Sequence, residues 1–507
     1  MDAVRSLGLK SFGLFGLAAC VALSLTAGCG GGSGSGGSGG STSSGGSTSM
    51  GGSTGGGGST DSGGSLPGGT AVWVHAYPNL VLPDVRATAT DQDGNVYVVG
   101  SVQPGEQDFG DGVKQCKAKF TCGFLLKLDP KGTQVWSRFF DPGDNEGVAV
   151  KAISVTADGI LLAIEWDRMP GTSTPLDLGL GPIQPDGYAN VVVARFDTDG
   201  NPVWNKSYGT NATANVNVYP DFMVSEGPKD FTIVGELNSL TADLGLGPMD
   251  RVGSGTDTIF IARFVNGAPV WQHSFNGYNG ASIYSLAKTP DGGYSLTGEL
   301  LGSMVGADYI PPIGDAMSSF AVHYDGDGNP VWAKDFISPQ GTRGKGGTGD
   351  SKGNVLLTGY GFGTINTNGG PTVVMDEEAS YLIKTDASGN TLSVATNDGS
   401  TFGLEMLSAF VVATDADDNI LWSGRRTNAN GVEYTDYIYT GRLTKLAPDG
   451  TQAWEITADD FGPSALAADP KGYVLAAGTY RNQLDLGTGS PAPQAKLEGV
   501  FIAKFAP

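Results

Sequence analysis

The sequence is poor in histidine, in basic residues and in long apolar runs. Its three histidines, His75, His273 and His323, form no H-x-x-x-H pair and no cluster with cysteine at zinc-site spacing. Lys and Arg number 30 against 52 Asp and Glu, a formal net charge of -22. Such a charge opposes binding to nucleic acid or to an anionic membrane surface. These shortages argue against zinc-based or histidine-based catalysis and against a nucleic-acid partner.

Helical patterning is also missing, whereas glycine is abundant. No stretch sustains a 3.6-residue apolar period with helix caps. The 81 glycines are more than twice the roughly 7% of average usage. Many of them lie in residues 30–69, which are almost entirely Gly, Ser and Thr and cannot bury enough apolar surface to fold. We therefore expect a flexible linker there.

The N-terminus has the order of a signal peptide. Arg5 and Lys10 precede an apolar stretch at residues 12–25, which is too short to span a bilayer of roughly 30 Å comfortably. Residues 25–29, LTAGC, resemble a bacterial lipobox, which implies cleavage before Cys29 and a diacylglycerol on its sulfur; a transmembrane anchor is the alternative. The sequence thus predicts a signal peptide (1–28), a lipidated Cys29 with its linker (29–69) and a folded part (70–507).

Two columns of repeated motifs run through the folded part. The first is a turn followed by an alternating strand with tryptophan, as in FDTDGNPVWNKSY at residues 196–208. Its marker positions, 61 to 68 residues apart, are Trp73, Trp136, Trp204, Trp271, Trp332, Ser393 and Trp454. The second column is a turn leading into an apolar strand that commonly ends in glycine, at residues 93–100, 158–165, 229–235, 291–298, 352–359, 417–424 and 471–478. Each column has seven copies.

Each repeat is predicted to form four strands. Short runs rich in Val, Ile, Phe and Tyr, bounded by Asp-Gly or Lys-Gly, are hairpin signals. Seven four-stranded units indicate an all-β, seven-bladed β-propeller, in which radial repetition protects the sheet edges. The chain ends on a third strand, residues 500–505, and the folded part begins on a fourth strand, residues 71–77. We expect these two strands to pair and close the ring.

The combined motifs resemble the bacterial β-propeller repeat proteins of the seven-bladed SBBP type, which are common among exported lipoproteins. The resemblance rests on A-x-D-x-x-G-N-V-Y-V-x-G, on D-F-G or L-D-L-G in the following loop, and on F-[IVL]-A-[KR]-[FL]-D-x-x-G-x-x-V-W. It covers residues 70–507. It implies the fold and says little about activity, because propellers host unrelated functions.

The tryptophan strand places two aromatic residues and a basic one on a single face, as with Trp204, Lys206 and Tyr208. We interpret this face as packing against the neighbouring blade, with a cation over a ring. Base stacking is the alternative, but it requires a basic groove. Because Ser393 replaces tryptophan in the fifth repeat, we expect the outer strand there to pack less well.

Calcium is the one cofactor that a motif suggests. D-x-D-G-N at residues 91–95, 197–201 and 325–329 resembles the start of a calcium loop, but the twelfth positions are Val102, Tyr208 and Phe336 instead of glutamate. The turns run directly into strands, so turn chemistry is the preferred interpretation and no metal ligand is assigned. Calcium bound in another geometry stays open.

The four cysteines agree with export. Cys20 leaves with the signal peptide and Cys29 carries lipid, which leaves Cys116 and Cys122 in one long loop. Their spacing permits a small disulfide-closed loop in an oxidising compartment, with two free thiols as the alternative. The alternating glycines and serines at residues 32–36 lie in the linker and form no nucleophile elbow. No catalytic residue is assigned.

A ligand is expected on the face that carries the long loops. These join the second and third strands at residues 102–123, 166–190, 237–257, 300–318, 361–379, 426–439 and 480–499. One residue past the strand-ending glycine lie four polar candidates for a ligand site at the mouth of the channel: Glu236, Glu299, Tyr360 and Arg425. Solvated loop stems are the simpler interpretation of the same residues.

Two classes of function follow. The favoured one is a monomeric lipoprotein of the outer membrane or cell surface, on its periplasmic or extracellular side, that serves as a binding or scaffold module for a protein or glycan. It would touch the membrane only through its lipid. The alternative is a propeller-type hydrolase or lyase acting on carbohydrates or lactones with a channel-bound metal. The scarcity of histidine favours the non-enzymatic class.

Overall fold

The computed structural model describes residues 66–143, 146–168, 175–183, 189–209, 218–238, 241–252, 258–277, 279–302, 304–305, 317–367, 369–397, 407–427 and 439–507. The predicted signal peptide, Cys29 and most of the linker lie outside these residues. The described part of the chain is all-β, and none of its segments forms a helix. Consequently it contains no helix of the length and apolarity needed to cross a bilayer.

Seven antiparallel sheets form the blades, and the strands of each are given from the inner to the outer one. Blade 1 contains β2 (Asp84–Thr90), β3 (Val96–Val102), β6 (Cys122–Leu128) and β7 (Gln134–Phe140). Blade 2 contains β8 (Glu146–Thr156), β9 (Gly159–Arg168), β12 (Ala189–Phe196) and β13 (Pro202–Tyr208). Blade 3 contains β14 (Val218–Ser225), β15 (Phe231–Leu237), β18 (Thr258–Val265) and β19 (Ala268–Gly277), extended at its edge by β22 (Met304–Val305).

The remaining blades repeat this order. Blade 4 contains β20 (Gly280–Lys288), β21 (Tyr294–Leu301), β23 (Met317–Tyr324) and β24 (Pro330–Phe336). Blade 5 contains β25 (Thr342–Gly349), β26 (Val355–Ile365), β27 (Val373–Thr385) and β28 (Thr391–Asn397). Blade 6 contains β29 (Leu407–Thr414), β30 (Ile420–Thr427), β31 (Tyr439–Leu446) and β32 (Gln452–Asp459). Blade 7 contains β33 (Gly462–Ala468), β34 (Val474–Tyr480), β35 (Glu498–Phe505) and β1 (Ala71–Leu80).

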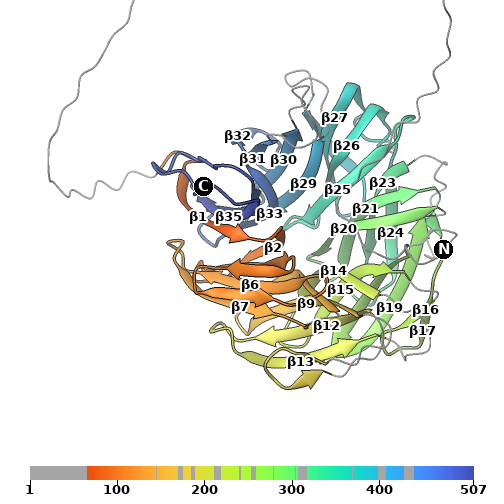
Figure 1. Ribbon diagram of the computed structural model, residues 1–507. Coiled ribbons are helices and arrows are strands. Elements are labelled where there is room, and N and C mark those ends of the chain that lie inside the picture. The colour runs from red at the N-terminus through yellow and green to blue at the C-terminus, as the bar shows by residue number, and fades with distance from the viewer. Residues whose placement is uncertain are drawn as a thin grey trace, which may run out of the picture. The chain divides into compact units, whose positions relative to one another are not determined.

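The blades are arranged around a central axis, with β2, β14, β20, β25, β29 and β33 nearest to it (Figure 1). The predicted closure of the ring is confirmed: β1 pairs antiparallel with β35, with Val74 opposite Ala503. The seam between the inner strands β33 and β2 is also bonded, because the Thr90 hydroxyl donates to the Ala468 carbonyl at 2.9 Å. The seven-bladed propeller expected from the repeats is therefore the observed fold.

The core lies between blades because the second strands are buried on both faces. In β3 all seven residues are buried. Val96 and Val98 pack with Leu475 and Ile502 of blade 7, whereas Tyr97 and Val99 pack on the other side with residues of blade 2. Alternation along one strand thus joins two neighbouring sheets.

The tryptophan column packs against the next blade, as the sequence predicted, and at several tryptophans the contact is with a glycine. A Cβ added at Gly132 would lie 2.5 Å from the Trp73 ring, and one at Gly389 would lie 2.8 Å from the Trp332 ring. The Trp332 indole also donates to the Ala387 carbonyl at 2.9 Å. Opposite Ser393, the equivalent Gly450 has no atom within 4 Å of an added Cβ. The weaker packing expected at the fifth repeat is confirmed.

The end of the linker completes this pattern for blade 7. Its third and fourth strands, β35 and β1, lie at opposite ends of the chain, so no hairpin turn joins them. Gly69 takes the place of that turn: its N–H donates to the Ala506 carbonyl at 3.1 Å, and the Trp454 ring lies 3.1 Å from an added Cβ. Ordered packing therefore begins before residue 70, the first residue of the predicted folded part.

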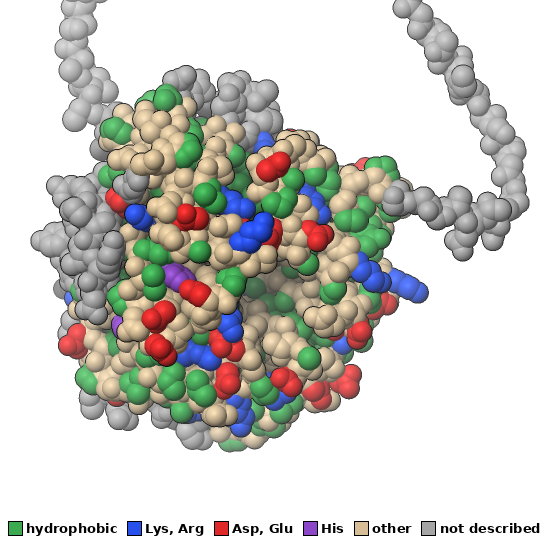
Figure 2. Space-filling view, turned by 180° about the vertical axis from the view of Figure 1, so that it is seen from behind, with side chains coloured by type: hydrophobic (Ala, Val, Ile, Leu, Met, Phe, Trp, Pro, Cys, Tyr) green, Lys and Arg blue, Asp and Glu red, His purple; other side chains and the backbone are tan. Residues whose placement is uncertain are grey.

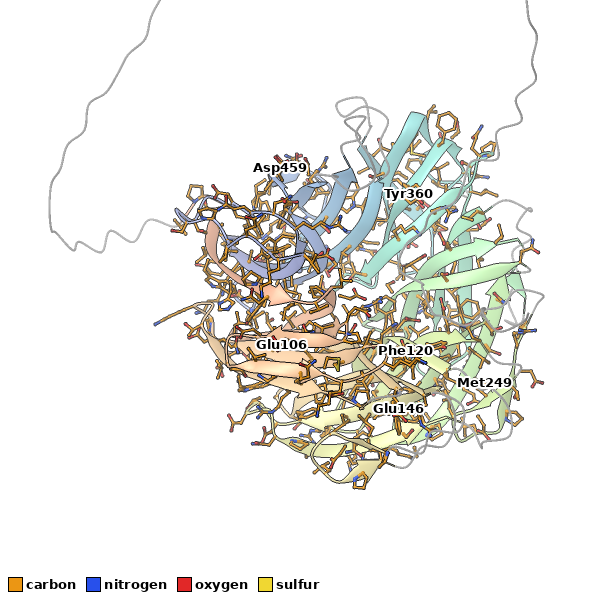
Figure 3. All side chains as sticks on the ribbon, viewed as in Figure 1. Glu106, Phe120, Glu146, Met249, Tyr360 and Asp459 are labelled. Atoms are coloured by element: carbon orange, nitrogen blue, oxygen red, sulfur yellow. A yellow bond between two sulfur atoms is a disulfide. The ribbon has the colours of Figure 1, made fainter. Side chains whose placement is uncertain are left out.

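The long loops are less free than the sequence suggested. Three of them carry short hairpins: β4 (Gly105–Asp108) with β5 (Val113–Cys116), β10 (Leu176–Asp177) with β11 (Pro182–Ile183), and β16 (Thr241–Asp243) with β17 (Pro248–Asp250). Leu244 and Met249 of the third hairpin are buried against Tyr208, on the outer strand of blade 2. Figure 3 shows Met249 at the outer part of the ring, and Figure 1 labels β16 and β17 there. These segments fill the outer gap between adjacent blades.

The D-F-G and L-D-L-G motifs account for this packing. Their apolar residues Phe109, Leu178 and Leu484 are buried in clusters that include the preceding blade. The aspartate turns the chain, as Asp177 Oδ1 accepts the Gly179 and Gly181 N–H groups at 2.7 and 3.1 Å. Four of the seven loops that we expected to serve binding therefore have a structural role along at least part of their length.

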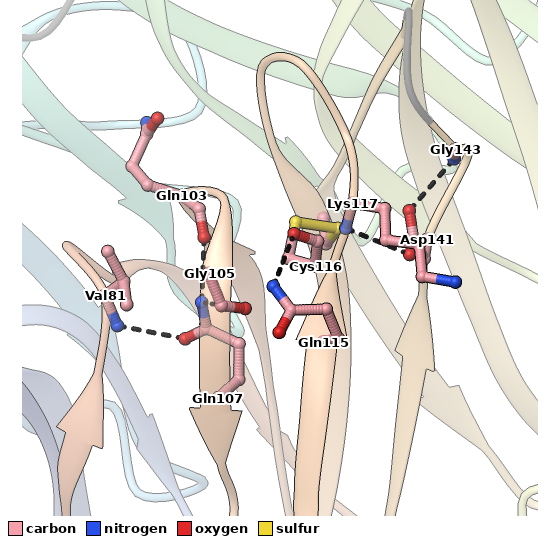
Figure 4. The surroundings of a disulfide bond; sticks show 10 residues. Val81, Gln103, Gly105, Gln107, Gln115, Cys116, Lys117, Asp141 and Gly143 are labelled. Carbon is pink, nitrogen blue, oxygen red and sulfur yellow. Dashed lines mark hydrogen bonds between the residues drawn. A yellow bond between two sulfur atoms is a disulfide. The ribbon is translucent and has the colours of Figure 1, made fainter.

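The predicted disulfide is present. Cys116 and Cys122 are bonded, and both are buried. Figure 4 shows the bond beside Lys117, whose N–H donates to Asp141 at 3.1 Å. Within the closed loop, the Lys119 N–H donates to the Glu146 carbonyl at 3.1 Å and the Thr121 carbonyl accepts from Val148 at 2.8 Å. The loop thereby ties blade 1 to the inner strand of blade 2.

Candidate ligand site at the mouth of the channel

A bulge interrupts the inner strand of every blade at the same level. In blade 1 the register shifts between Val85 and Ala87, opposite Gly100 on β3. The bulge brings the inner-strand backbone very close, so that a Cβ at Gly100 would lie 2.0 Å from the Asp84 carbonyl oxygen. The same approach occurs at Gly235, Gly298, Gly359 and Gly478. In these five blades the close approach leaves no room for a Cβ at the strand-ending glycine, whereas blade 2 has Ile164 opposite its bulge.

Each bulge adds one unpaired residue to the inner wall of the ring. In six blades these residues are Arg86, Lys151, Asp221, Tyr284, Lys345 and Ser464. In blade 6 the shift lies between Ser408 and Val411, and the side chains concerned fall outside the described residues. Because every inner strand starts shortly before its bulge and every second strand ends there, the bulges lie at the end of the channel where the long loops begin.

The first group of charges, the Lys151 cluster, consists of Lys151, Glu165, Asp167 and Asp221. Lys151 Nζ lies 2.9 Å from Glu165 Oε2 in its own blade and 3.6 Å from Asp221 Oδ1 in blade 3. The side chains of Lys151, Glu165 and Asp221 retain 12, 16 and 21% exposure. The cluster therefore spans two neighbouring inner strands and remains accessible from the channel.

The cluster holds a proton at neutral pH. Burial, followed by the nearby Glu165 charge and a hydrogen bond with Glu165, raises the pKa of Asp167 to about 8. Burial also raises the pKa of Asp221, although Lys151 opposes the shift. Burial alone would raise the pKa of Glu165 and lower that of Lys151, but their mutual attraction outweighs it, so the pKa of Glu165 is lowered and that of Lys151 is raised. Lys151 and Glu165 are ionised, and Asp167 is a proton donor.

The second group, the Lys345 cluster, consists of Tyr284, Glu299, Arg343, Lys345 and Tyr360. Lys345 Nζ donates to the Tyr284 hydroxyl at 3.1 Å and to Glu299 Oε2 at 3.4 Å, and the Tyr284 hydroxyl donates to Glu299 Oε1 at 3.1 Å. Arg343 Nη1 lies 3.9 Å from Glu299. The ammonium also lies 4.7 Å from the Tyr284 ring centroid and 5.9 Å from that of Tyr360, labelled in Figure 3.

Burial dominates the protonation of this second cluster. It lowers the pKa of Lys345, and Glu299 only partly offsets the effect. It also raises the pKa of Tyr284, to which the charges of Glu299 and Glu236 add. The cluster is a closed set of hydrogen bonds between blades 4 and 5.

The structure brings together some of the residues predicted from sequence. Glu299 and Tyr360 belong to the Lys345 cluster, and Glu236 holds the matching position on β15, opposite Tyr219. Arg425 holds it on β30, opposite Ser408, but its side chain lies outside the described residues. The level of the predicted site is thus occupied by polar residues from at least four blades.

Sequence reasoning missed Lys151, Asp221, Lys345, Glu165 and Asp167. Glu165 lies at the position of Glu236 and Glu299, but Ile164 precedes it in place of glycine, so the marker was absent. The bulged residues carry no local signal, because a bulge is a relation between two strands. The strand-ending glycine was the available clue, since it marks where a partner backbone approaches.

The D-x-D-G-N turns are occupied by their own hydrogen bonds. Asp91 Oδ1 accepts the Asp93 and Asn95 N–H groups, and Oδ2 accepts the Asn95 side-chain amide at 2.8 Å. In other blades the third-strand lysine binds the same carboxylate, as Lys504 does with Asp469 at 2.7 Å. Nowhere in the described part of the chain do three or more His, Cys, Asp or Glu side chains gather as metal ligands would. Turn chemistry explains the motif.

The face seen from behind the view of Figure 1 is hollowed near its middle. Figure 2 shows a hollow near the middle of that face, with Lys or Arg and Asp or Glu side chains at its rim. Both signs of charge are therefore mixed around the axis, although the whole chain is acidic.

Comparisons with known proteins identify no family. No family model matches the chain, and no curated protein matches it. Among solved structures it is similar to a Dyadobacter fermentans protein of unknown function, with 12% identity, coverage of 87% of this chain and 100% of the other, and a TM-score of 0.39. A variant of Synechocystis apocarotenoid oxygenase has 12% identity, coverage of 80% and 87%, and a TM-score of 0.36.

A third similar structure is a Bacteroides vulgatus member of the DUF4221 family. It has 8% identity, coverage of 86% of this chain and 97% of the other, and a TM-score of 0.29. Similarities this low assign neither a family nor an activity. The seven-bladed ring is established by the strand pairing itself.

Proposed function

We propose that this protein is an exported lipoprotein of the SBBP-repeat type, anchored through Cys29, whose propeller is a binding or scaffold module of the cell envelope. Its ligand enters the mouth of the channel on the face where the long loops begin. The observation that supports this proposal is the convergence of the Lys151 and Lys345 clusters at that mouth. Neither cluster is part of the repeat, since the equivalent positions in blades 1 and 7 hold Ser101 and Thr479.

The contrast with the structural ion pairs supports the same conclusion. Lys384 with Asp350, Lys445 with Asp415 and Lys504 with Asp469 lie 3.0, 3.0 and 2.7 Å apart, each within one blade. They recur because each ties a first turn to a third strand. The channel clusters cross between blades, recur nowhere else among the described residues and remain accessible, which is the pattern expected of a site.

The proposed location follows from the N-terminal segment and from the disulfide, which forms in oxidising compartments. Replacing Cys29 with serine should abolish incorporation of labelled palmitate and move the protein from the membrane fraction to the soluble fraction. Retention in the membrane without the lipid would contradict the anchor. We propose that the chain is a monomer, and sedimentation of the unlipidated chain measures this oligomeric state. We propose no nucleic-acid partner.

Binding at the mouth is tested with intact envelope from the source cells. The unlipidated full-length chain should bind it saturably, and a Glu299→Gln and Lys345→Met double variant should bind at least tenfold more weakly, because the loss of both partners opens the Lys345 cluster. A matched control is Arg442→Met with Glu455→Gln, an ion pair of 2.9 Å and comparable exposure on blade 6. Equal binding by the wild type and the channel variant would rule out the channel mouth.

One observation keeps an enzymatic alternative open, namely a hydrolase or lyase acting on carbohydrates or lactones. Protonated Asp167 beside ionised Glu165 is an acid and base pair suited to neutral pH. The described residues supply no metal site to accompany it. Turnover of nitrophenyl glycosides or of lactones that disappears in Asp167→Asn would favour the enzyme. A calcium titration that shifts the melting temperature would establish the cofactor suggested by the turns.

A further inference from the structure

The lysines at two bulges of the channel wall, Lys151 and Lys345, have different surroundings. Lys151 Nζ lies 2.9 Å from Glu165 and 3.6 Å from Asp221, so two carboxyl groups face it. Among the described residues, Lys345 Nζ pairs with one carboxylate, that of Glu299 at 3.4 Å. Burial disfavours the ammonium form of both lysines. The two carboxyl groups outweigh this effect and raise the pKa of Lys151, whereas Glu299 only partly offsets it and the pKa of Lys345 is lowered.

Arg343 adds a second cation next to Lys345 and has unused hydrogen-bond donors. It lies two positions earlier on β25, and its charge further disfavours the ammonium form of Lys345. Its guanidinium lies 3.9 Å from Glu299, beyond hydrogen-bond length, and donates no hydrogen bond to the described residues. The side chains of Arg343 and Lys345 retain 35 and 21% exposure. Both cations therefore reach the same carboxylate and remain accessible from the channel.

The chemistry of these two side chains restricts the ligand. A guanidinium pairs with a carboxylate through two parallel hydrogen bonds. A lysine amine that is desolvated and lies beside another cation is a nucleophile toward carbonyl carbon. A 2-oxo acid carries both groups on adjacent carbons. Because the Lys345 cluster contains two cations and one carboxylate, a ligand carboxylate also complements its charge.

We propose that Lys345 forms an imine with a small 2-oxo acid whose carboxylate is bound by Arg343. This activity goes beyond the proposed binding function, although it uses the same mouth of the channel. The contrast with Lys151 supports it, because Lys151 occupies the equivalent bulge of blade 2 but is held as an ammonium by two carboxyl groups.

The reaction needs no further reagent. The Lys345 ammonium first loses a proton to water. The nitrogen lone pair then forms a bond to the carbonyl carbon, and the π electrons of the C=O bond move to oxygen. One nitrogen proton passes to this oxygen through the Tyr284 hydroxyl, which lies 3.1 Å from Nζ. The new hydroxyl leaves as water with the remaining nitrogen proton, which yields the C=N bond.

The test uses the full-length Cys29→Ser chain, pyruvate and cyanoborohydride, which reduces an imine to a stable amine. Mass spectrometry of peptides measures how fast each lysine is modified at neutral pH. We expect Lys345 to be modified at least tenfold faster than any other lysine, Lys151 included. With methyl pyruvate, which has the same carbonyl but no charged carboxylate, this preference for Lys345 should disappear.

A matched pair of variants tests the role of the guanidinium. Arg343→Met should also remove the preference, whereas Arg442→Met, which removes an arginine paired with Glu455 in blade 6, should retain it. Equal modification of all lysines overturns the nucleophile. A preference that survives with methyl pyruvate or in Arg343→Met overturns the ligand class. The methyl pyruvate comparison needs no variant, so it decides even if Arg343→Met fails to fold. The proposed function fails separately, when the Lys345-cluster double variant binds envelope as well as the wild type does.

Discussion

At the scale of single residues, the protonation of Asp167 makes the stability of the folded chain depend on pH. Its pKa is about 8 in the folded chain against an ordinary value of 3.8. The folded state therefore binds more protons between these values, so this contribution to stability is complete below about pH 4 and is lost as the pH rises through 8. Asp167→Asn keeps the hydrogen-bond donor without the titration.

The resulting prediction concerns the pH profile of unfolding. Between pH 5 and pH 9 the free energy of unfolding of Asp167→Asn should rise by roughly 4 kcal/mol relative to that of the wild type, observed as diverging melting temperatures. The exposed turn residue Asp327 provides the control, because Asp327→Asn should run parallel to the wild type. Parallel curves for Asp167→Asn as well would show that the carboxyl group is already ionised near neutral pH.

A pair of glycines isolates the packing of the tryptophan column. Gly389 and Gly450 have φ angles of +79° and +89°. Alanine at either position is therefore destabilised by about 1 kcal/mol, because it must adopt the left-handed backbone conformation. Only at Gly389 does the added Cβ meet an indole, that of Trp332. We predict that Gly389→Ala is more destabilising than Gly450→Ala by about 1 to 3 kcal/mol in urea unfolding. Equal losses would mean that the indole moves aside freely.

At the scale of elements, the sequence was sufficient for the strands and insufficient for the bulges. Turn residues such as Asp91 and Asn95 act within five positions of each other, and the alternation in β3 is local, so both can be recognised without a structure. The bulged Lys151 is defined by its neighbours on β9 and β14, which lie in other parts of the repeat. The positions of Glu299 and Tyr360 followed from the glycine column, but their partner Lys345 did not.

The long loops were predicted to be exposed, but parts of them are buried. Their length suggested exposed binding segments, yet the D-F-G and L-D-L-G motifs within them bury Phe109 and Leu178 between blades. The signal was present in the sequence as a recurring apolar residue next to Asp and Gly. It was interpreted as part of a family motif instead of as a packing element, because the outer gap between blades is visible only in the assembled ring.

The disulfide-closed loop gives a prediction at this scale. Replacing Cys116 and Cys122 together with serine should cost about 2 kcal/mol, the value expected from chain entropy for so short a loop. Hydrogen exchange should accelerate at Lys119, Phe120 and Val148, whose N–H groups join the loop to β8. Treating the wild type with a reductant should reproduce both effects. Two free thiols in the mass of the native protein would contradict the bond.

At the scale of the whole molecule, stability depends on closure of the ring through blade 7. Removing residues 66–77 deletes most of β1 and the glycine turn beneath Trp454, which exposes the edge of β35 and leaves blade 7 with three strands. We predict a fall in melting temperature of roughly 10 °C or more and rapid proteolysis. Removing residues 30–60 from the predicted linker should change neither, and an unaffected ring in the first variant would refute the closure.

Blade 7, which is built from both ends of the chain, also determines where the molecule yields under mechanical load. Within its sheet β1 is an edge strand paired only with β35, and no hairpin turn connects the two, since Ala71 lies opposite Phe505 near the other end of the chain. Outside the sheet, the side chains of Trp73, His75 and Tyr77 bond to residues 130–134 of blade 1. Tension applied from the N-terminal side enters the ring at Gly69 and acts first on the Trp454 contact and then on this one strand pair. Under force the ring should therefore open at blade 7, while the six blades that are closed by their own turns keep their sheets.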